Sequence, residues 1–149
     1  MTGCEMKQVT KLTLIALMTA MLTPALSWAE GTMVVVVNAK NPVNKMSADE
    51  VSQLFMGQSE FFPGGSPATA VDLAENSPQR TEFAAKVLGK TPPQLHAYWS
   101  KMVFTGKGKP LKEVPTSKEV IDFLVKNTNA IGYMEKSAVD SNVKIVYSF

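Results

Sequence analysis

The chain has 149 residues, of which 45% are hydrophobic and 19% are charged, and its formal net charge is +2 at pH 7. This composition is typical of a globular protein, and the length suits one domain or at most two. The small net charge argues against a nucleic-acid-binding protein, because such proteins carry a broad basic surface.

The N-terminal segment has the organisation of a cleavable export signal. Two lysines precede an apolar run over residues 12–22, a proline follows the run, and small residues stand at Ser27 and Ala29, where a signal peptidase would recognise them. The run is too short to span a bilayer of about 30 Å at about 1.5 Å per residue, which disfavours an uncleaved anchor. We expect residues 1–29 to be removed and residues 30–149 to form the exported domain, which is not embedded in the membrane.

The first half of the exported domain predicts two strands and a helix. Residues 33–37 (MVVVV) form an unbroken apolar run, which is typical of a strand covered on both faces. Ser47 and Glu50 form a capping box, so a helix begins there and ends near Gly57. Residues 68–73 (ATAVDL) predict the second strand.

The second half predicts three helices and two strands. Ser77-Pro78 and Thr91-Pro92 each place a capping residue before a proline, so each begins a helix, the first of which ends at Gly89. The remaining expected elements are a basic loop over residues 104–113, a helix from the Thr116–Glu119 capping box, and strands over residues 130–134 and 143–147. Alternating helices and strands predict an α/β fold with a mainly parallel sheet flanked by helices.

Metal binding and catalysis find little support in the residues. The only cysteine, Cys4, lies in the export signal, and the only histidine is His96, which we interpret as an ordinary surface or packing residue. No nucleophile elbow or Walker loop occurs. We therefore expect a protein that is not an enzyme and uses no cofactor.

An anion site is the chemistry that the sequence favours. Open α/β sheets bind ligands beyond the carboxyl ends of their strands, and the helix that starts at Ser77 follows the second strand directly. The Ser77 hydroxyl and the first-turn amides of Gln79 and Arg80 suit phosphate or another oxyanion. The alternative is that Ser77 is only a helix cap. Asn38 is a lesser candidate ligand, followed by Thr116 and Ser117.

The order of motifs resembles the phosphate-binding proteins of ABC transporters. The motifs that carry the resemblance are residues 34–57, Phe62-Pro63-Gly64-Gly65, residues 77–89, Tyr98-Trp99, Phe104-Thr105-Gly106 and Ala130-Ile131-Gly132-Tyr133. The resemblance implies one lobe of a type II periplasmic binding protein, a periplasmic location and phosphate as the ligand.

Two departures from the family pattern keep a second function open. The family places an arginine where this chain has Leu73 and a glycine where it has Pro78, which cannot donate an amide hydrogen bond. The alternative function is an interaction module that keeps the fold, has lost the anion site and docks to an envelope protein such as a sensor or transporter. Phe61 and Phe62 form a candidate docking patch unless both side chains pack inward.

Overall fold

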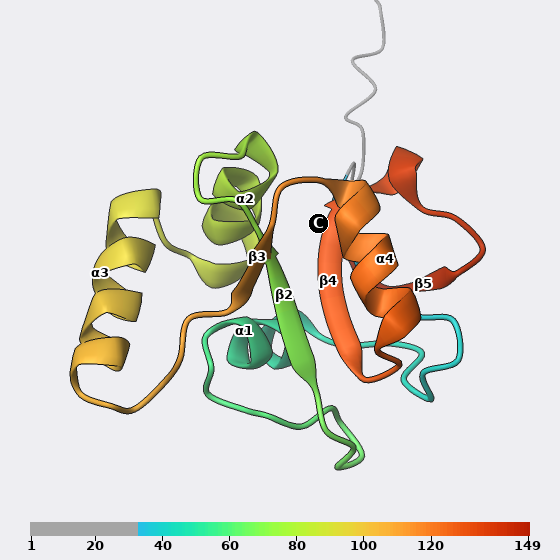
Figure 1. Cartoon of the computed structure of the whole chain (residues 1–149), viewed down its shortest axis with the longest axis horizontal. Helices are drawn as coiled ribbons and strands as arrows, with labels where there is room; N and C mark the ends of the chain where they lie inside the picture. Colours follow the sequence, from blue (N-terminus) through green and yellow to red (C-terminus); the bar gives the residue numbers. More distant parts are fainter. Residues whose placement is uncertain (1–32) are drawn as a thin grey trace, which may run out of the picture.

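The computed structural model describes residues 33–149, which form a single sheet with helices on both faces (Figure 1). The expected export signal, residues 1–29, lies outside the described residues. The elements in chain order are β1 (Met33–Asn38), α1 (Ala48–Phe55), β2 (Thr69–Leu73), α2 (Pro78–Phe83), the π-helical turn η1 (Ala84–Leu88), α3 (Pro92–Phe104), β3 (Lys112–Val114), α4 (Ser117–Lys126), β4 (Ala130–Glu135), the 3-10 turn η2 (Lys136–Ala138) and β5 (Val143–Ser148).

The sheet is mixed, with strand order β3-β2-β4-β1-β5. Strand β2 pairs in parallel with β3 and β4, whereas β1 pairs antiparallel with both β4 and β5. Four strands therefore point one way and β1 alone points the other way, so the expected α/β sheet flanked by helices is confirmed and is mixed in detail. The valine run of β1 is fully buried as expected, but burial on both faces does not encode the direction of a strand.

The two faces of the sheet are covered by different helices. Gly132 of β4 faces α4, because a Cβ atom built on it would lie 2.5 Å from a methyl group of Val120. The next residue, Tyr133, points to the opposite face, as strand geometry requires. There its ring packs against Phe55 of α1 and Phe83 of α2.

The helix starts predicted from capping residues are confirmed. The side chains of Ser47, Ser77, Thr91 and Thr116 each accept a hydrogen bond from the backbone three residues ahead. The helix predicted from Ser77 to Gly89 changes to a π-helical turn after Phe83 and ends at Gly89 with φ 62°. The expected loop over residues 104–113 contains most of the short edge strand β3, which the sequence analysis missed.

Candidate binding site

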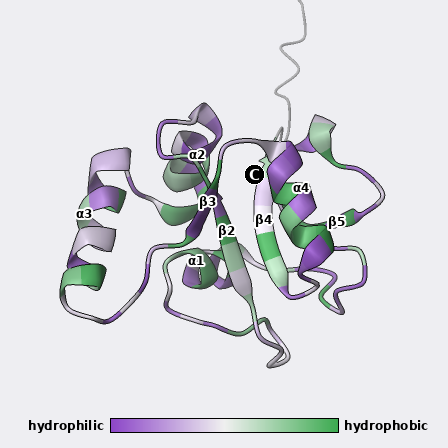
Figure 2. Cartoon of the chain, viewed as in Figure 1, coloured by the Kyte–Doolittle hydropathy of each residue, from purple (hydrophilic) through white to green (hydrophobic). Residues whose placement is uncertain are grey.

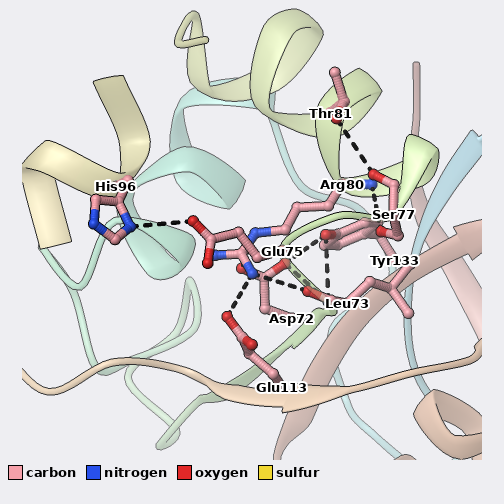
Figure 3. A network of polar contacts seen from close by, with 9 residues as sticks. All are labelled: Asp72, Leu73, Glu75, Ser77, Arg80, Thr81, His96, Glu113 and Tyr133. Carbon is pink, nitrogen blue, oxygen red and sulfur yellow. Dashed lines mark hydrogen bonds and ion pairs between the residues drawn. The ribbon is translucent and has the colours of Figure 1, made fainter. Parts of the chain in front are cut away.

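The carboxyl end of β2 is where four elements bring polar side chains together (Figure 3). Asp72 comes from β2, Arg80 from α2, Glu113 from β3 and Tyr133 from β4. These strands are parallel neighbours, so their carboxyl ends meet at one edge of the sheet. This is the edge at which open α/β sheets bind ligands.

Arg80 is the centre of the cluster and is 9% exposed. Its Nε lies 3.2 Å from Oδ2 of Asp72, and its Nη1 lies 2.5 Å from Oε1 of Glu113. The same Nη1 also donates to the backbone carbonyl of Leu73 over 3.1 Å. Burial lowers the pKa of Arg80, but Asp72 and Glu113 outweigh it and raise the pKa overall, so the guanidinium is charged.

Asp72 is buried, and both of its carboxylate oxygens have partners within the chain. Its Oδ1 accepts hydrogen bonds from the Tyr133 hydroxyl and from the Leu73 amide. Burial raises the pKa of Asp72, and the opposing effect of Arg80 and Tyr133 does not cancel it. Burial and the neighbouring carboxylate likewise raise the pKa of Tyr133, so Tyr133 stays a hydrogen-bond donor. Its ring stacks on Phe83, with centroids 4.0 Å apart and planes 6° apart.

The predicted ligand residues at the start of α2 have intramolecular partners. The Ser77 hydroxyl accepts from the Arg80 amide over 3.1 Å, which is the geometry of a helix cap. The Gln79 side chain donates to Glu135 over 2.9 Å. Arg80 turns back toward β2, as described above. The structure thus places all three residues at the expected edge but ties each to another part of the chain.

Asn38 lies at the other end of the sheet. It pairs with Val143 of β5, and the preceding residue Val37 pairs with Ile131 near the start of β4. Its side-chain amide donates to the Leu124 carbonyl over 2.7 Å, and its oxygen accepts from the Lys40 amide. Asn38 therefore does not share a site with Ser77, Gln79 and Arg80. Thr116, a lesser candidate, caps α4.

Asp72, Glu113 and Tyr133 belong to the cluster but were not among the candidate ligands predicted from the sequence. A signal for Asp72 was available, because it is the one charged residue in the otherwise apolar strand of residues 68–73. Glu113 lies in the missed strand β3, and Tyr133 is one aromatic residue within a buried strand. No local pattern connects either residue to Arg80.

Metal binding and membrane crossing find no support in residues 33–149. Within that range no three His, Cys, Asp or Glu side chains are grouped so that they could hold a metal ion. His96 is exposed, and its Nδ1 lies 3.1 Å from Oε1 of Glu75. None of the described helices has both the length and the apolar character needed to cross a bilayer.

Solved structures of phosphate-binding proteins resemble the fold of this chain, although no family model and no curated protein sequence matches it. A candidate phosphate ABC transporter substrate-binding protein from Clostridium perfringens, solved with bound phosphate, superposes with a TM-score of 0.63 at 22% identity. An ABC-type phosphate transport receptor from Vibrio cholerae gives 0.62 at 20% identity. PstS from Borrelia burgdorferi gives 0.59 at 12% identity.

The chain shares their fold. Each superposition covers 78% of this chain but only 44%, 45% and 46% of the respective neighbour, so the chain spans less than half of their length. The expected binding-protein-like α/β fold, with the extent of a single lobe, is confirmed. The Arg80 cluster therefore lies on a fold that this chain shares with these proteins.

Proposed function

We propose that this protein is an exported interaction module that keeps the fold of a phosphate-binding lobe and docks to an envelope protein. The observation that supports the proposal is that the chain itself supplies partners for the residues of the expected anion site. Arg80 is the positively charged side chain at the expected helix start, and two carboxylates and a carbonyl occupy its guanidinium. Its charge is therefore already compensated before any ligand arrives.

The electrostatics of the cluster oppose a phosphate ion. The ion would have to displace Glu113 and then lie beside the buried carboxylate of Asp72, and like charges at such distances repel. Pro78 has no amide to offer, and the Ser77 hydroxyl already serves as a cap. Among the described residues, no buried side-chain nitrogen or oxygen lacks a hydrogen-bond partner. The site therefore presents no buried polar side chain in need of a ligand.

The docking surface that we propose is the end of α3. Phe104 is 92% exposed and Val103 is 48% exposed, and Figure 2 shows this last turn of α3 in the hydrophobic colour. Exposed apolar groups that lie together are typical of interaction sites. Of the docking patch expected at Phe61 and Phe62, only Phe61 is accessible to a partner: it is 55% exposed, whereas Phe62 is buried.

The docking proposal can be tested by site-specific photo-crosslinking in cells. A benzophenone amino acid placed at position 104 should give a discrete crosslinked product, whereas the same group at the exposed position 126, at the end of α4, should give none. Position 126 is a matched control because it also lies in the last turn of a surface helix. The docking proposal fails if position 104 gives no product or if both positions give the same products.

A second candidate function is the binding of phosphate or a similar oxyanion. It is supported by the likeness to phosphate-binding proteins and by the location of Ser77 at the carboxyl end of β2. Isothermal titration with inorganic phosphate separates the two candidates. We expect no saturable heat from the native chain, whereas Glu113→Ala, which frees one side of Arg80, should gain weak binding. Saturable binding by the native chain that is lost in Ser77→Ala would instead establish the oxyanion function.

A further inference from the structure

A pocket of about 470 Å³ opens beside the Arg80 cluster, between α3 and the ends of β2 and β3. Its volume lies in the range of sites that bind small molecules, about 300–1,000 Å³. Its lining includes Asp72, Glu75, Arg80, Trp99, Leu111 and Glu113. Val103 and Phe104 of the proposed docking surface also line this pocket, but the docking proposal gives no role to its charged side.

One side of the pocket is apolar and held in place by packing. Trp99 contributes an aromatic wall, and its ring lies close to two glycines. A Cβ atom on Gly57 would lie 3.1 Å from this ring, and one on Gly108 would lie 3.7 Å from it. Tyr98 packs edge-on against the same indole, with centroids 5.4 Å apart, and its hydroxyl donates to the Met56 carbonyl. The indole is therefore positioned before any ligand binds.

The polar side of the pocket carries excess negative charge. It presents the carboxylates of Asp72, Glu75 and Glu113 and a single guanidinium, that of Arg80. Arg80 is paired with Asp72 and Glu113, so these three groups together carry one negative charge. Glu75 adds another, since its only ion-pair partner among residues 33–149 is the exposed ring of His96. The charges on the lining residues therefore favour a cation over an anion.

We propose that this pocket binds a small organic cation, namely an ammonium or guanidinium group on an apolar body. The cation would lie between the Glu75 and Glu113 carboxylates and donate hydrogen bonds to them. Such charge-assisted hydrogen bonds are stronger than those between neutral groups. The apolar body would lie against Trp99 and Leu111, and the indole face also attracts cations. The inference goes beyond the docking function, and either proposal can fail without the other, because solute binding and crosslinking to a partner are measured separately.

Ligands that differ only in charge provide the test. The full chain carrying Trp28→Phe retains Trp99 as its one tryptophan, so its fluorescence reports on the pocket. We expect 2-phenylethylammonium to change this fluorescence saturably near neutral pH. The neutral analogue 2-phenylethanol should bind about tenfold more weakly, the difference that one charge-assisted hydrogen bond contributes. The anionic analogue 3-phenylpropionate should give no saturable change.

A pair of conservative variants locates the binding. Glu75→Gln removes a carboxylate that is 60% exposed, so the fold should be kept while affinity for the ammonium falls several-fold. Glu119→Gln makes the same change on α4, away from the pocket, and should leave the affinity unchanged. The proposal is overturned if the three ligands bind alike or if Glu75→Gln has no effect. It is also overturned if a lysine within a short peptide binds while the free ammonium does not, because the occupant would then be a partner protein.

Discussion

Arg80 and Asp72 form a buried ion pair, with the arginine Nε 3.2 Å from the carboxylate Oδ2 and side chains that are 11% and 7% exposed. The pair joins α2 to the carboxyl end of β2, which is the region that would otherwise be open to a ligand. Tyr133 supports the same carboxylate from β4. The edge of the sheet is thus fixed by a network within the chain, and the stability of that network can be measured.

Replacing Arg80 should destabilise the fold more than replacing its second partner. Arg80→Met keeps the length of the side chain but leaves Asp72 buried without its counter-ion, and breaking such a pair costs about 3–5 kcal/mol. Glu113→Gln should cost less than about 1 kcal/mol, because Glu113 is 48% exposed and water screens its interaction. Urea unfolding of both variants measures the difference. Equal losses would mean that burial of the pair has little energetic consequence.

Tyr133 should give the protein a specific sensitivity to alkali. The pKa of Tyr133 is raised in the folded state, so the unfolded chain loses this proton first, from about pH 10 upward. The unfolded state then binds fewer protons, and stability falls as the pH rises, by up to about 1.4 kcal/mol per pH unit.

The variant Tyr133→Phe isolates this effect. At neutral pH it should be less stable than the native chain by about 1–3 kcal/mol, because Asp72 loses a buried hydrogen-bond donor. Above about pH 10 the gap should narrow, since phenylalanine has no proton to lose. Denaturant unfolding across this range measures the gap, and a gap that stays constant with pH would contradict the raised pKa of Tyr133.

The parts of this fold that were predictable are those set by contacts between residues close together in the sequence. Helix starts were found because Ser47, Ser77, Thr91 and Thr116 act on backbone groups only three residues away. The direction of β1 was missed because an apolar run is equally buried in parallel and antiparallel pairs. Strand β3 was missed because its three residues lack the alternation of a longer strand.

The location of the candidate site was predictable from the sequence, but the partners of its side chains were not. The helix start after β2 indicated which edge of the sheet to inspect. The sequence could not show that the Arg80 side chain folds back onto its own strand, because a helical position does not fix the rotamer of a long side chain. It also could not show that Glu113, 33 residues further along, reaches the same guanidinium.

A variant of Ser77 tests whether this residue is a helix cap or an anion ligand. Its hydroxyl accepts from the Arg80 amide, so Ser77→Ala should lower the free energy of unfolding by about 1 kcal/mol. Thr116→Ala removes the equivalent cap from α4 and should cost a similar amount. Thermal unfolding with and without millimolar phosphate completes the test. If phosphate stabilises the native chain but not Ser77→Ala, the serine binds the anion and the closed-site interpretation is wrong.

Gly132 should be intolerant of any side chain, because α4 packs directly on it. A Cβ atom there would lie 2.5 Å from Val120 and 3.0 Å from Val71, which is closer than packed methyl groups allow. Gly132→Ala should therefore force α4 away from the sheet and cost about 1–3 kcal/mol.

The matched control is Gly108→Ala, whose Cβ would meet the flexible end of Met102 at 3.0 Å. That methyl group can move aside, so the loss should stay below about 0.5 kcal/mol. Chemical unfolding of both variants gives the comparison. A large loss in Gly132→Ala alone would show that the direct contact between α4 and β4, and not the added methyl group as such, is what costs stability.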